Sequence, residues 1–385
     1  MSSEELDLLY HSYFSIITTT DSDSLSTGGA DEQENVFLAS NYSSFTANTV
    51  SSPDIEFDSA TGKITAKATG TYLLVFIPSI TIASGGIGID VRIKKNGSTE
   101  VLLENLVAFA ITDPISATCH KILDLTAGDY IELTVSGTGT TAVVAQNGTS
   151  FTMLKANGDY ASLAQSGDGV QGVANTLEVI GDQDLAGSGN IVTNLKNITY
   201  ASGTGLLTPA NTRPFLLLTT LMGESNTTNQ ETSIGIYADG SIIDGGSALI
   251  NKNMDPNEES YGLLKTLTGG ETVSGRYQGG TGTKITTKKG TSFSVFDLSN
   301  NNGAGTPSAF ISFAVAADSD PQGSGDSNAF NDNNWTSYST TTHSAATNIT
   351  YSSNDGTFVV SNSGKYLILW NLFVGSATQS VERDV

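Results

Sequence analysis

Short runs in which apolar and polar residues alternate recur along the whole chain, and no 3.6-residue apolar period is sustained. Clear examples are residues 90–93, 130–135 and 292–295. Alternation at every second position is typical of strands that bury one face. Asn96-Gly97 and Asp239-Gly240 stand between such runs, and these dipeptides favour two-residue hairpin turns because both positions take positive φ. The pattern predicts an all-β chain of antiparallel strands in sandwiches.

The same sequence elements return at a nearly fixed spacing. Gly-Thr-Ser-Phe begins at Gly148 and again at Gly290, and Asn-Ile-Thr-Tyr begins at Asn197 and at Asn348. Residues 55–76 align without a gap with residues 349–370. A recurring period of this kind indicates tandem modules. We predict a non-repeating segment over residues 1–10, repeat one over 11–156, a divergent repeat two over 157–304, and the first half of repeat three over 305–385.

Repeats two and three each depart from repeat one. Repeat two has Arg213-Pro214 where repeat one has Gly70-Thr71. Repeat three stops at Val385, and by the period its remaining turn and strands would fall between about residues 391 and 443. Because half a module cannot close its own core, we expect either a longer chain or another subunit to supply the missing strands.

Three strands carry apolar residues on both faces and occupy the same place in each repeat. They cover residues 72–77, 215–218 and 366–370. In a two-layer sandwich one face packs inside and the other meets water, so the second face of such a strand needs a cover. A neighbouring subunit, arranged around a closed rotation axis, is one possibility. A loop of the same module is the other.

The net charge and the composition limit the kinds of partner that the chain can bind. The chain has a formal net charge of −22 and a pI of about 4.2, a field that repels nucleic acid and anionic membrane surfaces. No apolar run reaches the length of a membrane span. We therefore expect neither nucleic-acid binding nor membrane insertion. The acidic residues 1–7 lack the apolar centre of a secretory signal, so we expect synthesis in the cytoplasm.

The pattern over residues 55–76 resembles the signature of the complement C1q and tumour-necrosis-factor family of jelly rolls. The matching residues are Phe57, Gly62, Ile64, Ala66, Gly70, Tyr72 and Phe76. Repeat two lacks the Gly-x-Tyr element. The resemblance implies tandem ten-stranded jelly rolls that form a homotrimer through their tyrosine-bearing strands. On that basis the trimer-interface candidates are Tyr72, Leu74, Phe76, Phe215, Leu217, Tyr366, Ile368 and Trp370.

Candidates for catalysis are few. The three histidines, His11, His120 and His343, fall at non-equivalent places of the repeats. His120 follows the single cysteine, Cys119, but neighbouring residues of a strand point to opposite faces and could not act as a pair. A single cysteine also excludes an internal disulfide. We expect no catalytic residue and no cofactor.

Paired acids offer one alternative to that expectation. Asp21 and Asp23 follow the first strand of repeat one, and Asp318 and Asp320 follow the first strand of repeat three. Carboxylates at this spacing can bind Ca²⁺ together with backbone carbonyls, and the resemblance adds that some C1q-like trimers hold calcium. Solvated loop acids are the other interpretation.

Tandem acidic modules that are rich in Gly, Ser, Thr and Asn and lack a collagen-like stalk resemble bacteriophage structural proteins. We predict a non-enzymatic protein of a tailed-phage virion, a trimeric head fibre or decoration protein that projects from the particle. Residues 1–10, with Leu6, Leu8 and Leu9, would anchor it to other virion proteins of the capsid or tail, although a frayed terminus is an equal alternative. The rival functions are a tail fibre or surface adhesin that binds a host-cell glycan, and a glycan-processing enzyme.

Overall fold

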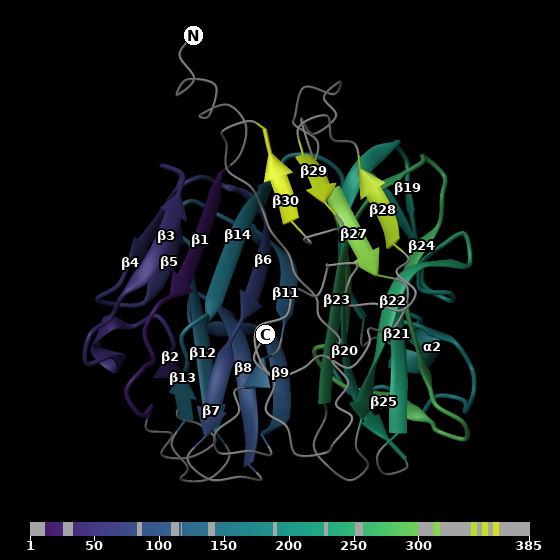
Figure 1. Cartoon of the computed structure of the whole chain (residues 1–385), viewed down its shortest axis with the longest axis horizontal. Helices are drawn as coiled ribbons and strands as arrows, with labels where there is room; N and C mark the ends of the chain where they lie inside the picture. Colours follow the sequence, from purple (N-terminus) through teal and green to yellow (C-terminus); the bar gives the residue numbers. More distant parts are fainter. Residues whose placement is uncertain are drawn as a thin grey trace.

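The structure is a computed structural model of the chain (Figure 1). The residues it describes are 12–25, 34–82, 87–108, 115–116, 118–137, 143–187, 191–226, 230–250, 257–298, 311–315, 340–344, 349–352 and 357–361. These residues form antiparallel sheets, and the prediction of an all-β chain of tandem jelly-roll sandwiches is confirmed. No helix among them is long and apolar enough to span a membrane.

Module one has two main sheets, each of which we name after one of its inner strands. The β6 sheet runs in the order β11 (Cys119–Leu125), β6 (Gly70–Ile77), β14 (Ser150–Ala156), β1 (Tyr13–Thr18) and β3 (Ala47–Ser51). The β12 sheet runs in the order β4 (Ile55–Asp58), β5 (Lys63–Ala66), β12 (Tyr130–Gly137), β8 (Ile87–Lys95) and β9 (Ser98–Ala108), and β2 (Glu34–Asn35) also pairs with β12. A small third sheet joins β10 (Ile115–Ser116), β7 (Ser79–Ile82) and β13 (Val143–Ala145), and one 3-10 turn covers Ala39–Asn41.

Module two repeats this strand order. Its β20 sheet contains β23 (Asn257–Leu267), β20 (Arg213–Ser225), β26 (Ser292–Asp297), β15 (Tyr160–Gln165) and β17 (Ile191–Lys196), with β25 (Ile285–Thr287) paired to β20. Its β24 sheet contains β18 (Ile198–Ala201), β19 (Leu206–Pro209), β24 (Val273–Gly279), β21 (Gln230–Ala238) and β22 (Ser241–Ile250), with β16 (Glu178–Val179) paired to β24. The short helix α2 covers Gln183–Ala186.

Two strand pairs are described in the third repeat. They are β27 (Ile311–Val315) with β28 (Thr340–Ser344), and β29 (Ile349–Ser352) with β30 (Thr357–Val360). The second pair has the register of module one, because Ile349 faces Val360 as Ile55 faces Ala66. Both pairs therefore repeat pairings of module one, β1 with β3 and β4 with β5.

The strands apolar on both faces divide their side chains between two surfaces. Tyr72, Leu74 and Phe76 lie in the core of module one, and Phe215 and Leu217 lie in the core of module two. These five trimer-interface candidates were therefore assigned to the wrong face, since each is shut inside its own sandwich. The alternate residues Leu73, Val75, Leu216 and Leu218 form a separate cluster with residues of both modules. Tyr366, Ile368 and Trp370, and the anchor residues Leu6, Leu8 and Leu9, lie outside the described residues.

The predicted hairpins form as expected. Asn96 and Gly97 have φ of 50° and 82° between β8 and β9, and Asp239 and Gly240 have φ of 46° and 79° between β21 and β22. Positive φ at both central positions is the type I′ turn, whose twist matches that of the flanking strands.

We expect Gly97→Ala and Gly240→Ala each to lower the free energy of unfolding by about 1 kcal/mol, because a Cβ disfavours positive φ. A Cβ at either glycine would meet nothing closer than 3.9 Å, so the loss reflects conformation and not crowding. Gly203→Ala is the control, because that glycine has open space and no positive φ. Urea unfolding measures all three, and an equal loss in the control would contradict the prediction.

Candidate functional site between the two modules

The outer face of the β6 sheet packs against the outer face of the β20 sheet. The buried residues of this surface are Leu73, Val75, Ile122, Tyr160, Leu216, Leu218 and Phe296. Figure 1 shows β11 and β23 in the middle of the molecule, between the two sandwiches. The cover of the doubly apolar strands in module one is therefore module two of the same chain, and neither a second chain nor a loop of module one is needed.

β11 is the edge strand of module one that packs against module two. It contacts the broad face of the β20 sheet along β26, β15 and β20. At its margins, Thr220 donates to the carbonyl of Thr118 at 3.0 Å and Asn194 donates to the carbonyl of Ile122 at 3.4 Å. These contacts satisfy carbonyl groups that an edge strand leaves unpaired.

A buried histidine lies at the centre of this contact. His120 on β11 is 2% exposed, and its Nδ1 lies 3.1 Å from Ser294 Oγ while its Nε2 lies 3.1 Å from Ser292 Oγ. Ser294 in turn donates to Ser162 Oγ at 3.2 Å. Cys119 points the other way, into the core of module one, so the two residues lie on opposite faces of the strand as expected.

Burial lowers the pKa of His120 to about 3, because a charged ring would lose its hydration in this surface. The unfolded chain binds this proton near the ordinary pKa of about 6.5. The contribution of His120 to stability is therefore fully present above pH 6.5 and is lost as the pH falls from there toward 3.

We expect His120→Gln to remove part of the acid sensitivity of folding. Between pH 7 and pH 5 the wild-type chain should lose about 1–2 kcal/mol more of its free energy of unfolding than the variant, at roughly 1 kcal/mol per pH unit below the unfolded pKa. Urea titrations at both pH values provide the comparison, in which the carboxylates common to both chains cancel. Parallel pH profiles would refute the role of His120.

A charge cluster occupies the position where repeat two departs from repeat one. Arg213 at the start of β20 lies 3.7 Å from Asp159 and 3.2 Å from Asp297, and both carboxylates are nearly fully buried. Asn197 and Asn211 donate to Asp159 at 2.8 and 2.9 Å. Arg213, which stands where repeat one has a glycine, therefore supplies the positive charge that pairs with the two buried carboxylates.

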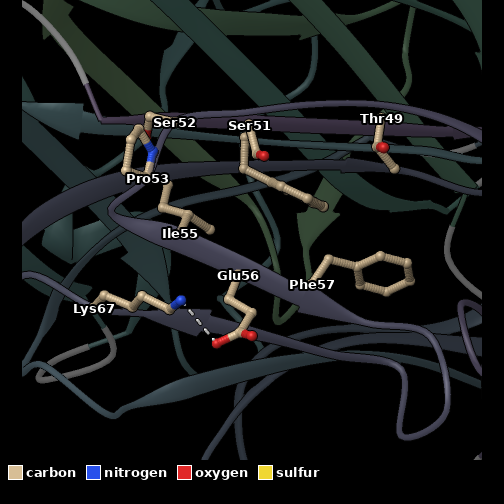
Figure 2. A pocket seen from close by; sticks show the side chains of 9 residues that line it. Thr49, Ser51, Ser52, Pro53, Ile55, Glu56, Phe57 and Lys67 are labelled. Carbon is tan, nitrogen blue, oxygen red and sulfur yellow. Dashed lines mark ion pairs between the residues drawn. The ribbon is translucent and has the colours of Figure 1, made fainter. Parts of the chain in front are cut away.

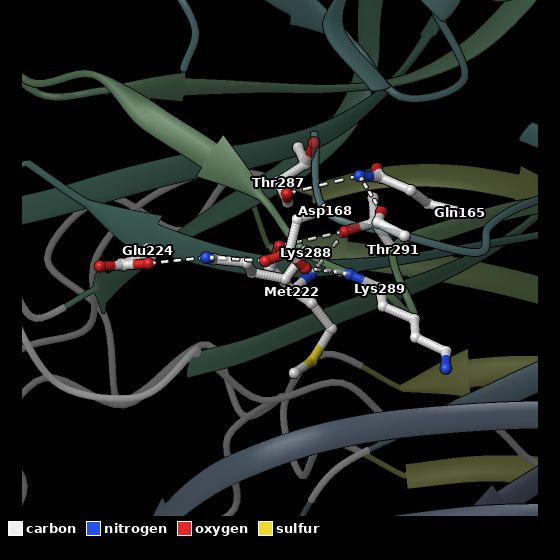
Figure 3. Close-up of polar contacts among 9 residues, drawn as sticks. Gln165, Asp168, Met222, Glu224, Thr287, Lys288, Lys289 and Thr291 are labelled. Atoms are coloured by element: carbon white, nitrogen blue, oxygen red, sulfur yellow. Dashed lines mark hydrogen bonds and ion pairs between the residues drawn. The ribbon is translucent and has the colours of Figure 1, made fainter. Parts of the chain in front are cut away.

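A second ionic cluster holds the turn before β26 (Figure 3). Lys288 Nζ lies 2.8 Å from Glu224 and 3.1 Å from Asp168. Burial acts to lower the pKa of Lys288, but the contacts with Glu224 and Asp168 outweigh it and the pKa is raised. Lys288 also donates its backbone N–H to Met222 at 2.8 Å. This cluster therefore joins the turn to β20.

A shallow, open pocket of about 490 Å³ lies at the free edge of module one (Figure 2). Its residues come mainly from β3 and β4, the edge strands of the two main sheets, and from the segment between them. They are Phe14, Thr49, Ser51, Ser52, Pro53, Ile55, Glu56, Phe57 and Lys67. Lys67 and Glu56 form a solvent-exposed ion pair at 3.0 Å.

The candidate calcium residues make separate local contacts. Asp21 accepts from the backbone N–H of Asn147 at 2.8 Å, and Asp23 accepts from Ser43 Oγ at 2.6 Å. Within the described part of the chain, no group of three or more His, Cys, Asp or Glu side chains is placed to hold a metal ion. Asp318 and Asp320 lie outside the described residues, so calcium binding stays a prediction.

The comparisons with known proteins find similar structures only. No family model and no curated protein matches the chain. Murine APRIL is 17% identical with a TM-score of 0.26 and covers 38% of this chain and 98% of its own. The Eiger TNF of S. frugiperda is 15% identical with a TM-score of 0.23 and covers 38% and 92%. The insecticidal delta-endotoxin Cry8Ea1 of Bacillus thuringiensis is 10% identical with a TM-score of 0.21 and covers 75% and 53%.

These matches bear on the fold alone. The jelly-roll sandwiches of the modules are established by their own strand order. None of the three is described as a bacteriophage protein. The homotrimer and the virion partners stay predictions.

Sequence reasoning missed the residues that join the modules. The sequence shows apolar residues on both faces of β6. The prediction assigned Tyr72, Leu74 and Phe76 to the outer surface, but Leu73 and Val75 are the residues that lie there. The signal for His120 was its place in the strand that precedes the repeated turn at residues 125–129. The signal for Arg213 was its replacement of a glycine in an otherwise recurring pattern.

Proposed function

We propose that the chain is a non-enzymatic structural protein of a tailed-phage virion, a head fibre or decoration protein that projects from the particle. The observation that carries the proposal is the buried apolar surface between the modules. Aliphatic side chains of both sandwiches and the His120–serine contacts are buried there. Two sandwiches joined in this way form one stiff body, which suits a projecting element.

A structural role also agrees with how the polar groups are used. His120 is enclosed between two modules, and the buried acids Asp159 and Asp297 both pair with Arg213. Each of these groups has partners from strands that pack together, which is how a structural role would use it. The anchor, in this proposal, is the segment over residues 1–10.

The test is the protein content of purified virions produced by the genome that encodes the chain. We expect the chain in stoichiometric amounts in particles banded on a density gradient, with antibody labelling at the capsid. Deletion of residues 1–10 should release it from the particle while the released chain stays folded. Recovery of the intact chain only in the soluble fraction of the lysate would refute the proposal.

A second candidate function rests on the pocket of Figure 2. An aromatic ring, Phe57, stands beside the hydroxyls of Thr49 and Ser51 and the ion pair of Glu56 with Lys67. The lining of this pocket is more polar than apolar, and sugar rings, which carry hydroxyl groups around an apolar face, fit a surface of this kind. A tail fibre or adhesin that binds a host-cell glycan would use it.

A glycan array separates the two candidates. The adhesin role predicts binding that Glu56→Gln reduces at least about tenfold, because a hydrogen-bonded charge in a site contributes about 1.5–3 kcal/mol. Glu132→Gln, a change on β12 outside the pocket residues, should leave binding unchanged. Absence of binding to any glycan, or an equal effect of both substitutions, would eliminate the adhesin.

A further inference from the structure

The contact between modules one and two has a short covalent connection at one end. Residues 157–159 alone connect β14 to β15. Asp159 is fixed to module two, since its carboxylate is buried in the charge cluster at the start of β20. Ala156 is fixed to module one by its pairing with β6. Asn157 and Gly158 are therefore the point about which the two sandwiches can turn as units, and we call them the pivot.

Each sandwich has a hydrophobic core of its own. The core of module one and the core of module two are separate clusters, and the surface between the modules is a third. Met222 of β20 is the described residue of module two that packs in the core cluster of module one. Turning about the pivot would uncover the surface between the modules and the Met222 contact, and would leave the rest of both cores in place.

His120 lies away from the pivot along the contact. Tyr160, the first residue of β15, lies with its hydroxyl 3.1 Å from that of Thr71 beside the pivot. Asp124 of β11 pairs with Thr71, so β11 leads away from the pivot as it is followed back from Asp124 through Ile122 to His120. Since a rotation displaces distant groups farthest, opening separates the ring of His120 from module two.

His120 contacts module two through uncharged hydroxyl groups. Its Nδ1 and Nε2 each lie 3.1 Å from a serine hydroxyl, of Ser294 and of Ser292. A neutral imidazole donates from one nitrogen and accepts at the other, and a hydroxyl can serve either. A protonated ring would donate to both serines, but hydroxyl groups carry no charge to offset the lost hydration of the cation.

The charged groups around β11 pair with one another and not with the ring of His120. The strands that contact β11 are β6, β8, β9, β15, β20 and β26. β6 and β15 carry no acidic or basic residue; Tyr72 of β6 lies in the core of module one and Tyr160 is beside the pivot. On β11 itself, Asp124 accepts from Thr71. The described ion pairs that involve β11 and the other strands are Lys121 with Glu100, Arg92 with Asp90, Lys95 with Asp129, Arg213 with Asp297, and Lys288 with Glu224, and Lys94 lies across from Glu132.

We propose that the contact between modules one and two is an acid-sensitive latch: protonation of His120 lets the two sandwiches turn apart about Asn157-Gly158 while each stays folded. The latch does not depend on a virion role, because it follows from the contact itself.

The sign of the pH effect follows from the two states of His120. In the docked state burial lowers its pKa to about 3, and in the open state the hydrated ring titrates near the ordinary value of about 6.5. Docking is therefore strongest above pH 6.5 and weakens as the pH falls from there toward 3. In that window the ratio of open to docked chains rises about tenfold per pH unit.

Thiol modification at neighbouring positions of β15 tests the latch in the full chain. Ser162→Cys places a reporter in the contact, whereas Ala161→Cys places one in the core of module two. Ser202→Cys is an exposed reference. Each maleimide rate is divided by that of the reference at the same pH, because the reactivity of the thiol itself changes with pH. Cys119 is buried and gives a low background.

We expect the normalised rate of Ser162→Cys to rise about 25-fold from pH 7 to pH 5. At pH 5 it should exceed that of Ala161→Cys at least about tenfold, because opening the contact costs less than unfolding module two. His120→Gln in the Ser162→Cys chain should reduce the rise to less than about threefold, since glutamine does not titrate. His343→Gln is the matched control, a histidine of the third repeat, and should leave the rise unchanged.

Three results would overturn the proposal. A change of less than about threefold for Ser162→Cys in the otherwise unaltered chain means that acid does not open the contact. Equal normalised rates for Ser162→Cys and Ala161→Cys at pH 5 mean that module two unfolds and does not turn away intact. A full rise that persists in His120→Gln means that another group controls the contact.

Discussion

Arg213→Met should lower the free energy of unfolding by about 3–5 kcal/mol, the largest effect that we expect from a single charge. The guanidinium lies 3.2 Å from Asp297 and 3.7 Å from Asp159. Both carboxylates are 3% exposed, so water cannot replace the lost cation. Urea unfolding at pH 7 measures the loss.

Two further variants make this result specific. Lys67→Met breaks the ion pair with Glu56, whose side chains are 50% and 59% exposed, and should cost at most about 1 kcal/mol. Adding Asp297→Asn to Arg213→Met should recover part of the stability, because one of the two buried charges is then gone, while Asp159 keeps both oxygens for Asn197 and Asn211. If the double variant is less stable than Arg213→Met alone, the cluster does not act through charge.

Leu216→Ala should loosen module one although it is a change in module two. Leu216 is buried in the surface between the modules, and truncation of a buried leucine costs about 2–5 kcal/mol through lost contacts and the cavity left behind. Because Leu73, Val75 and Ile122 of module one share this surface, their strands lose support. Hydrogen exchange of the peptide that covers β11 should accelerate.

Leu217→Ala is the matched control one residue away. Leu217 lies in the core of module two, so its truncation should destabilise module two by a similar amount. Exchange should then accelerate in β20 and β26, and β11 should change less than it does in Leu216→Ala. If both substitutions accelerate hydrogen exchange in β11 equally, the two modules unfold as one unit. The surface between the modules and the core of module two would then not contribute separately to stability.

Much of the local structure could be predicted from the sequence. The alternating runs became strands, and Asn96-Gly97 and Asp239-Gly240 became turns with positive φ at both residues. These features depend on a few neighbouring residues, whose steric preferences act whatever the rest of the chain does. The repeat register also anticipated that both modules have one strand order.

The charge cluster of module two has an aligned counterpart in module one. In module one, Gly70 lies against Lys155, because a Cβ on Gly70 would come within 2.5 Å of Lys155 Cε. The corresponding residues of module two are Arg213 and Asp297, which form an ion pair. The cation has therefore moved from one strand to the other between the repeats, and this exchange is visible in the aligned sequences.

Strand type, turns and the tandem repeat were determined by the sequence alone, because they follow from backbone preferences and from a period of two. That period divides the residues of β6 into two apolar sets, but it does not say which set faces the core of its own sandwich. The tertiary structure decided this, and it also decided that the cover of Leu73 and Val75 comes from a module whose residues lie more than 80 positions later in the chain. Only packing between such distant segments could bring His120 against Ser292 and Ser294.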